Sequence, residues 1–314
     1  MTWVDRRTPF DRVHIRWLYG HVGCGKSAIA QSVAERLARK KRLAASFFFF
    51  RDAGDRARIW KLIPTLAYQL SLSVPSTAPY IEAALRAQPK LLVPGVEALS
   101  VQFERLVYEP LKKAVSLLRT LFKGPYLIVL DGLDECDDHQ EVGRLIAGLL
   151  SLFEGDPSIP LRILITSRVE RHIEKELRSP FVRLDSLVDK TSHEDIKQYL
   201  SLRFQHASQV DRVIQSLGKA WPPEQYLDLL VKHADGSFIF AATFANFILN
   251  DNPLSPGETP IDRLPLAVKA DPGLDGLYLR TLARSESHRY FMVVITAIAT
   301  LEGSLSITQL ADLV

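Results

Sequence analysis

The first 190 residues of this 314-residue sequence predict an α/β fold built on a five-stranded parallel sheet, and the residues after them predict helices alone. In the first part, short apolar segments alternate with longer segments of helical spacing, which is the pattern of strands joined by helical crossovers. Some of the apolar segments are continuous, as in parallel strands that are covered on both faces. From residue 191 onward no segment has a convincing strand pattern.

Each predicted element has its own local pattern. A strand at 14–19 ends in a glycine-rich loop, and apolar residues after Lys26 recur at helical spacing. Four consecutive phenylalanines, 47–50, predict that the second strand is covered on both faces. Four prolines between residues 75 and 94 are expected to interrupt regular structure in the following crossover. The predicted strands span 14–19, 44–50, 126–130, 161–166 and 181–184, and the helices after the second and third strands span 59–72, 101–118 and 141–153.

The pattern changes at residue 191, where we place a domain boundary. Residues 192–195, Ser-His-Glu-Asp, resemble a capping box that opens a helix. The sequence therefore predicts an α/β domain at 1–190 and a separate helical part after it. The predicted helices of this second part span 193–207, 223–234, 237–249 and 286–300.

Composition and charge favour a cytoplasmic protein without a membrane partner. The net charge is only +3, and basic residues are interspersed with acidic ones, which gives little support for nucleic-acid binding. The two cysteines, Cys24 and Cys136, imply no disulfide framework and favour a reducing compartment. The first 16 residues do not resemble a secretory signal. The longest apolar runs, 238–249 and 291–301, fall short of the roughly 20 residues that cross a bilayer.

The loop after the first predicted strand has the phosphate-binding pattern G-x-x-x-x-G-K-[ST]. Glycines let the backbone turn N–H groups toward phosphate oxygens, and the N-terminus of the next helix adds a positive dipole. Lys26 would pair with the β- and γ-phosphates, and Ser27 would offer its hydroxyl to Mg²⁺. We therefore predict binding of a nucleoside triphosphate, ATP with Mg²⁺. The predicted phosphate-binding residues are Gly20, Gly23, Cys24, Gly25, Lys26, Ser27 and Ala28.

A weaker interpretation of the same loop is a dinucleotide-binding turn. Residues 23–28 also satisfy the looser pattern G-x-G-x-x-[GA], and Asp52 would then bind a ribose. That pattern does not account for the pair Lys26 and Ser27. We therefore favour the nucleoside triphosphate.

Acidic residues follow the third predicted strand, at the end of the sheet where open α/β folds bind ligands. Asp131 comes directly after an apolar run and is expected on the Mg²⁺ side of the site. Asp134 and Glu135 are candidates to orient or deprotonate an attacking water, and the sequence leaves open which of them is the base. Asp138 and Glu141 have the spacing of a capping box for the next helix.

Arg168 follows the fourth predicted strand. At that position its guanidinium could contact the γ-phosphate and report whether this phosphate is present. The alternative is a surface salt bridge. Together with Asp134 and Glu135, Arg168 completes the predicted catalytic set.

Three segments of the chain together resemble the NACHT class of signal-transduction NTPases. The likeness is to the fungal NACHT proteins, whose NTPase region is also described as a nephrocystin-like N-terminal domain. Later segments resemble the small helical domain of these proteins and the opening of their winged-helix domain. The segments of the NTPase region are 17–30, 130–136 and 166–168, and the later segments are 236–242, 274–278 and 295–313.

The resemblance implies a P-loop NTPase (NACHT) domain at 1–190 with strand order 5-1-4-3-2, a small helical domain at 191–284 and the beginning of a winged helix at 285–314. It also implies a nucleotide-controlled switch, closed with ADP and activated by exchange for ATP, as in innate-immunity or programmed-cell-death receptors. ATP-bound chains are expected to self-associate through the NTPase domain. An effector domain and ligand-sensing repeats are expected to lie outside this chain.

Three hypotheses about function follow, from different classes. The leading one is a slow ATPase that acts as a molecular switch. The second is a nucleotide-binding scaffold with negligible hydrolysis. The third is a nucleic-acid-remodelling P-loop ATPase, which the weak basic balance and the lack of an aromatic and basic stripe disfavour.

Overall fold

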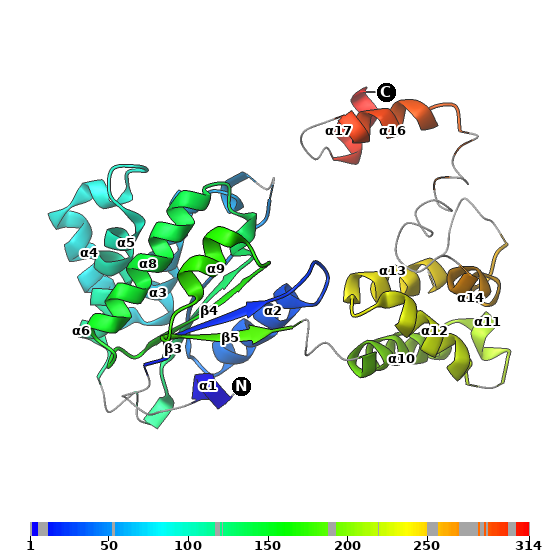
Figure 1. Cartoon of the computed structure of the whole chain (residues 1–314), viewed down its shortest axis with the longest axis horizontal. Helices are drawn as coiled ribbons and strands as arrows, with labels where there is room; N and C mark the ends of the chain where they lie inside the picture. Colours follow the sequence, from blue (N-terminus) through cyan, green and yellow to red (C-terminus); the bar gives the residue numbers. More distant parts are fainter. Residues whose placement is uncertain are drawn as a thin grey trace. The chain divides into compact units, whose positions relative to one another are not determined.

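The computed structural model of the chain, drawn in Figure 1, divides into two compact units. Met1–His21 and Lys26–Leu187 form the first unit, and Val22–Gly25 and Val188–Val314 form the second. The residues that the structure describes are 2–5, 12–51, 54–116, 120, 122–187, 193–218, 220–249, 257–269, 282, 286, 288–300 and 306–313.

A five-stranded sheet lies in the first unit, in the order β2-β3-β4-β1-β5, and every neighbouring pair is parallel. This confirms the predicted α/β fold, and the order is the one implied by the resemblance, 5-1-4-3-2, counted from the other edge. Strands β3 and β4 are buried along their whole length, which accounts for their apolar sequences. The strands are β1 (Ile15–Tyr19), β2 (Leu43–Phe48), β3 (Tyr126–Asp131), β4 (Leu161–Ser167) and β5 (Val182–Ser186).

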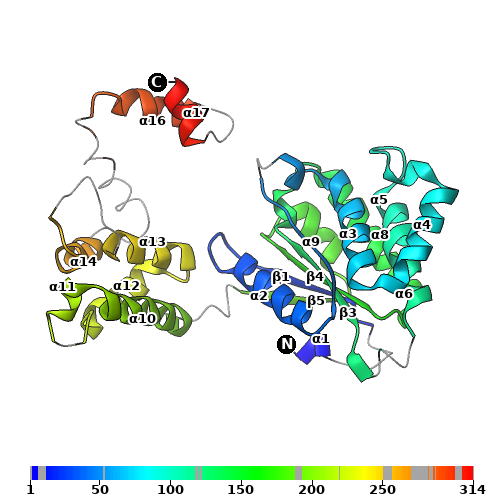
Figure 2. The ribbon, with the colours of Figure 1, turned by 180° about the vertical axis from the view of Figure 1, so that it is seen from behind.

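Helices cover both faces of the sheet, as a comparison of Figures 1 and 2 shows. On one face α2 packs against β3 and β4, because Ala30, Ala34 and Leu37 recur at helical spacing and are buried. On the other face α8 and α9 lie side by side. These helices are α2 (Lys26–Arg39), α8 (His139–Gly155) and α9 (Arg171–Leu177).

Short helices fill the crossover from β2 to β3. Pro75 and Pro89 follow α-helices that end at Ser73 and Ala87, as predicted, whereas the predicted interruption is wrong for Pro79. Pro75 and Pro89 begin 3₁₀ helices, and Pro79 lies in the first turn of α4. Proline suits a first helical turn because the N–H that it lacks has no acceptor within the helix there. The elements are η1 (Gly54–Arg56), η2 (Ile59–Lys61), α3 (Leu62–Ser73), η3 (Pro75–Thr77), α4 (Ala78–Ala87), η4 (Pro89–Leu92), α5 (Leu99–Phe103), the π-helix η5 (Glu104–Tyr108) and α6 (Glu109–Ala114).

The run of four phenylalanines is only partly buried. Strand β2 ends at Phe48, and it lies at an edge of the sheet. Phe47 and Phe49 are buried, whereas Phe50 is 55% exposed, with the guanidinium carbon of Arg56 5.2 Å from its ring centroid. The prediction that the whole run is covered on both faces is therefore wrong.

Helix α1 (Thr2–Asp5) is anchored where the strands begin. Arg162 in β4 donates to the carbonyl oxygen of Trp3, and Arg42 donates to that of Val4. Both arginines are buried. The indole N–H of Trp3 donates to the carbonyl oxygen of Val13 over 2.9 Å. Both the backbone of α1 and the side chain of its tryptophan are therefore hydrogen-bonded to the rest of the first unit.

The second unit contains packed helices, as predicted for the residues after 191. Buried apolar residues of α10, α12, α13 and α14 form one cluster. Ser192 of the predicted capping box and the segment 274–278 lie outside the described residues, and the helix predicted at 286–300 begins at Phe291. In the described part of the chain no helix is long and apolar enough to cross a membrane. The helices are α10 (His193–Val210), α11 (Arg212–Gln215), α12 (Glu224–Ala234), α13 (Phe238–Leu249), α14 (Pro260–Lys269), α16 (Phe291–Thr300) and α17 (Ile307–Leu313).

Candidate functional site

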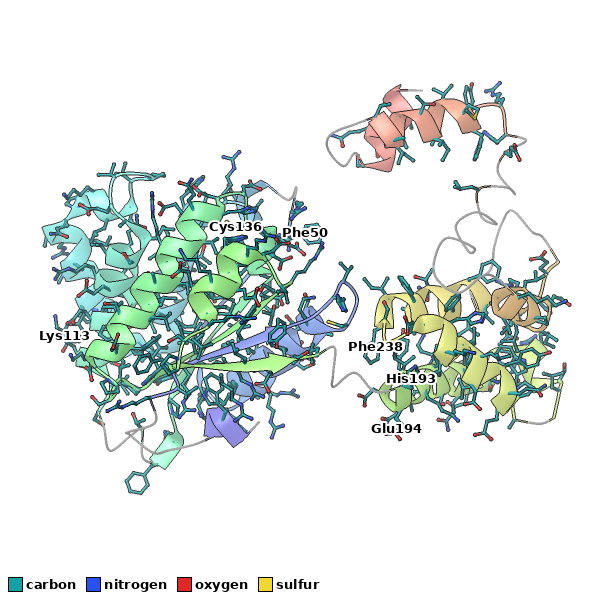
Figure 3. All side chains as sticks on the ribbon, in the orientation of Figure 1. Phe50, Lys113, Cys136, His193, Glu194 and Phe238 are labelled. Atoms are coloured by element: carbon teal, nitrogen blue, oxygen red, sulfur yellow. The ribbon has the colours of Figure 1, made fainter. Side chains whose placement is uncertain are left out.

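The predicted site residues follow strands that end at one edge of the sheet. Tyr19 of β1 lies beside Ser167 of β4, and Leu130 of β3 lies beside Ile165 of β4. Since parallel strands end at the same edge, the loop after β1, the acidic residues after β3 and Arg168 after β4 all begin there. Figure 3 labels two side chains at this end of the first unit, Phe50 after β2 and Cys136 after β3.

The loop between β1 and α2 depends on glycine for its backbone. Gly23 and Gly25 have φ values of 79° and 89°, which residues with a side chain rarely adopt. Lys26 is the first residue of α2, and its Nζ donates to the carbonyl oxygens of Gly20 over 2.8 Å and His21 over 2.7 Å. The lysine side chain therefore folds back over the start of the loop. Of the other predicted phosphate-binding residues, Gly20 and Cys24 are buried, and Ser27 and Ala28 are exposed.

Asp131, the last residue of β3, is only 3% exposed. The hydroxyl of Thr166 in β4 donates to its Oδ1 and accepts the N–H of Gly132 over 3.2 Å. A carboxylate this deeply buried is costly unless hydrogen bonds or a cation compensate for its lost hydration. The position therefore fits a residue on the cation side of a phosphate site.

Gly132 makes the turn that brings the next acidic residues back toward the sheet. Its φ of 68° is left-handed, and a Cβ at this position would lie 3.2 Å from the carbonyl oxygen of Phe49. The turn leads into the 3₁₀ helix η6 (Leu133–Glu135), whose Leu133 is buried. Asp134 and Glu135 are thus held by a fixed backbone but have different partners.

Asp134 is paired with Arg168. The backbone N–H of Arg168 donates to Oδ1 of Asp134 over 3.0 Å, and its Nε lies 3.2 Å from Oδ2. The aspartate is 3% exposed and the arginine side chain is 42% exposed. The salt bridge that the sequence allowed for Arg168 is therefore present, and it reaches a buried carboxylate.

Glu135 has a different surrounding. It is half-buried, and its Oε2 accepts the backbone N–H of Arg51 over 3.1 Å. The guanidinium of Arg51 donates to the carbonyl oxygen of Asp134 over 3.3 Å. The Glu135 carboxylate is therefore held by a neutral donor, whereas that of Asp134 faces a cation.

Residues just beyond η6 are structural. Asp138 caps α8 by accepting the N–H of Glu141 over 3.0 Å, as their spacing predicted. Burial raises the pKa of the Cys136 thiol to about 11. Among the described residues no group of three or more His, Cys, Asp and Glu side chains could hold a metal ion. Mg²⁺ does not require such a group, because it takes one or two carboxylates together with phosphate oxygens and waters.

The residues at this edge fit a nucleotide phosphate chain with Mg²⁺. The loop has the glycine conformations that phosphate cradles need, followed by the N-terminus of the 14-residue helix α2. Ser27 is the second residue of that helix, after Lys26, and the buried carboxylate of Asp131 stands at the same edge. One hard cation would thus have a hydroxyl and a carboxylate oxygen from this chain.

Residues 2–168 match the family described as Nephrocystin 3, N-terminal, which is more than half of the 314 residues. The chain belongs to this family. The resemblance to a nephrocystin-like N-terminal domain is therefore confirmed. The segment that matches the Nephrocystin 3 family includes the loop, Asp131, Asp134 and Glu135, and its last residue is Arg168.

Solved structures with a similar fold include the structure of C. elegans PCH-2 and the structure of Drosophila ORC bound to DNA. PCH-2 is 12% identical with a TM-score of 0.42, covering 85% of this chain and 61% of that chain. ORC is 12% identical with a TM-score of 0.35, covering 91% and 61%. The chain thus spans about three fifths of each structure's length. No curated protein matches the chain.

Two residues at this edge of the Nephrocystin 3 domain carry no site prediction of their own. Thr166 had a signal, because it is a hydroxyl residue at the end of an otherwise apolar stretch of strand. Arg51 follows β2, and no motif marks it. Asp52, the ribose-binding residue of the dinucleotide interpretation, lies outside the described residues.

Proposed function

We propose that the chain is a nucleotide-dependent molecular switch of the NACHT type, which binds ATP and ADP with Mg²⁺ and hydrolyses ATP slowly in the cytoplasm. One observation carries this proposal: the glycine loop with Lys26 follows β1, and the buried carboxylate of Asp131 ends β3, at the same edge of one sheet. Membership of the Nephrocystin 3 family supports it, since the matched segment contains both features.

In this proposal the loop and α2 bind the phosphates. Lys26 would exchange its two carbonyl partners for the β- and γ-phosphates, gaining charge-assisted hydrogen bonds. Ser27 and Asp131 would hold Mg²⁺, which supplies charge neutralisation to the phosphate oxygens. Backbone N–H groups of Gly20, Gly23, Cys24, Gly25 and Ala28 and the helix dipole would complete the cradle.

We assign the base to Glu135. Asp134 already accepts both an N–H and the guanidinium of Arg168, so its carboxylate is committed to a cation. Glu135 accepts one backbone N–H and is half-buried. It would take the proton of a water whose oxygen attacks the terminal phosphorus. Asp134 would then position Arg168.

Arg168 is proposed as the group that reports the nucleotide state. Its guanidinium pairs with Asp134 and is 42% exposed, so a γ-phosphate could compete for it. The phosphate would be lost on hydrolysis and the pair with Asp134 restored. ATP-bound chains would self-associate through the first unit, and effector and sensing regions would be supplied outside this chain.

Titration calorimetry with ATP and ADP, each with Mg²⁺, tests the binding step. We expect binding by the wild type, and a loss of at least about tenfold in affinity, about 1.4 kcal/mol, in Lys26→Ala. The matched control is Lys175→Ala, since Lys175 is 83% exposed on α9. Absence of nucleotide binding in the wild type would overturn the proposal.

A single-turnover assay separates the switch from the scaffold with negligible hydrolysis. We expect phosphate release in the wild type, abolished in Glu135→Gln and reduced in Asp134→Asn. No release in the wild type would favour the scaffold, and turnover stimulated by DNA or RNA would favour the nucleic-acid-remodelling ATPase. Analytical ultracentrifugation with ATP and with ADP tests self-association, which we expect only with ATP.

A further inference from the structure

Thr166 is a fully buried hydroxyl between two strands of the candidate site. It is the penultimate residue of β4, and its relative exposure is 0%. The strand next to it on one side is β1, where Leu18 is its partner in register. On the other side β3 ends at Asp131. Thr166 therefore lies between the strand that leads into the loop and the strand that ends in the acidic residue.

The hydroxyl of Thr166 acts both as a hydrogen-bond donor and as an acceptor toward residues at the end of β3. It donates to Oδ1 of Asp131 and accepts the N–H of Gly132 over 3.2 Å. The residues before it in β4, Ile163 to Ile165, are buried and apolar, so valine would pack there as well. Burying a hydroxyl costs free energy unless the hydroxyl is hydrogen-bonded. Its partners are thus the reason for a threonine at this position.

We propose that Thr166 is the positioning residue for Asp131: it fixes the orientation of the carboxylate that takes the Mg²⁺ of a bound nucleotide. This inference rests on the proposed function. Thr166 acts through Asp131 and does not contact the nucleotide. Removing a group that orients a metal ligand typically lowers metal affinity or activity 10- to 100-fold.

The matched variants are Thr166→Val, which removes the hydroxyl and keeps the shape, and Thr166→Ser, which keeps the hydroxyl. Affinity for a fluorescent ATP analogue is measured with excess Mg²⁺ and with EDTA, and Mg²⁺ is titrated at fixed nucleotide. We expect Thr166→Val to raise about tenfold the Mg²⁺ concentration that gives half of the Mg²⁺-dependent increase in nucleotide binding. The same concentration in Thr166→Ser should lie within about twofold of wild type. Affinity in EDTA should be equal in all three proteins.

A double mutant tests whether Thr166 acts through the carboxylate. If it does, Thr166→Val should add nothing to the loss of Mg²⁺ dependence in Asp131→Asn, because the two effects are not independent. Should Thr166→Val fail to fold by circular dichroism, Thr166→Ala removes the same hydroxyl with less branched bulk.

The outcomes separate the two proposals. Mg²⁺-dependent binding that is the same in wild type, Thr166→Val and Thr166→Ser would overturn the role of Thr166 and leave the proposed function intact. Loss of affinity in EDTA as large as the loss in Mg²⁺ would also overturn it, because it would show general damage to the site. No nucleotide binding by the wild type would overturn the proposed function and this role with it.

Discussion

At the end of the sheet where the strands begin, the buried charged side chains are arginines, and at the end where β3 finishes they are aspartates. Arg42 and Arg162 donate to backbone carbonyl oxygens, including those of Trp3 and Val4 in α1. Asp131 and Asp134 accept from β4 and the residue after it. The guanidinium groups donate to backbone carbonyl oxygens of the chain itself, whereas the carboxylates stand beside a phosphate-binding pattern.

The difference teaches that a buried charge has to be judged by its partners. Trp3 packs with its ring centroid 5.1 Å from the guanidinium carbon of Arg162, and α1 covers that end. Such a closed arrangement indicates an anchor. At the other end Arg168 remains 42% exposed while it holds Asp134, so a ligand can compete for it. Substitutions should therefore affect stability at the first end and binding at the second.

The largest expected effect is on stability, from Trp3→Ala. Trp3 is 1% exposed, and truncating a large buried aromatic side chain typically costs about 3–5 kcal/mol of the free energy of unfolding. The measurement is urea denaturation followed by circular dichroism, with Phe122→Ala as the control, since Phe122 is 74% exposed. A Trp3→Ala protein as stable as the control would show that α1 is not an anchor.

The next prediction compares the removal of one buried charge at each end of the sheet. Arg162→Met removes the donor to Trp3, and we expect a loss of about 2–3 kcal/mol, because a buried carbonyl is left unpaired. Asp131→Asn keeps an acceptor for Thr166, so its stability should change by less than about 1 kcal/mol while Mg²⁺-dependent nucleotide binding falls. Equal destabilisation by both substitutions would remove the distinction between the two ends.

Much of the candidate site could be predicted from sequence, because each of its motifs is a short local pattern, although the motifs themselves lie far apart in the chain. The pattern at Gly20 to Ser27 is local, and so are the apolar run of β3 and the acidic residues after it. The strand positions also followed from local apolar runs, and each of the five lies within two residues of its predicted bounds at both ends. Short-range patterns of this kind need no knowledge of the fold.

The anchoring end could not be predicted, because its contacts join distant parts of the chain. The bond from Arg162 to Trp3 spans 159 residues, and neither residue belongs to a motif. Helix α4 was missed for another reason: Pro79 lies in its first turn, where proline is compatible with a helix. Thr166 shows the same limit within the site, since its partner Asp131 is 35 residues away.

A smaller effect is expected from the pair at the binding end. Asp134→Ala removes the carboxylate oxygen that accepts the backbone N–H of Arg168. We expect a loss of about 1–2 kcal/mol in the free energy of unfolding, because this N–H is left without its acceptor. Asp134→Asn keeps an acceptor oxygen and should lose less. Urea denaturation of both variants checks this, and a larger loss in Asp134→Asn than in Asp134→Ala would contradict it.

The smallest expected effect is a pH dependence of the free energy of unfolding. It comes from His172 at the binding end, whose surroundings differ from those of His14 at the anchoring end. His14 has carbonyl oxygens beside both ring nitrogens, at 2.8 and 3.0 Å. His172 in α9 stacks on His139 with ring centroids 4.3 Å apart, and its buried Nε2 has no hydrogen-bond partner among the described residues. Burial, and next the neighbouring His139, lower the pKa of His172, although Glu170 and Asp134 oppose this. The folded chain therefore favours the neutral ring of His172.

Because the folded pKa of His172 is lowered, the unfolded chain binds more protons at this group below its ordinary pKa of about 6.5. The free energy of unfolding should therefore fall as the pH drops from about 6.5 through the folded pKa, and the contribution should level off below it. His172→Asn should remove that contribution, and His139→Asn should reduce it by removing the neighbouring ring. Urea denaturation between about pH 5 and pH 8 measures the difference from wild type at each pH. Parallel curves for wild type and His172→Asn would show that the stacked pair does not make the binding end sensitive to protons.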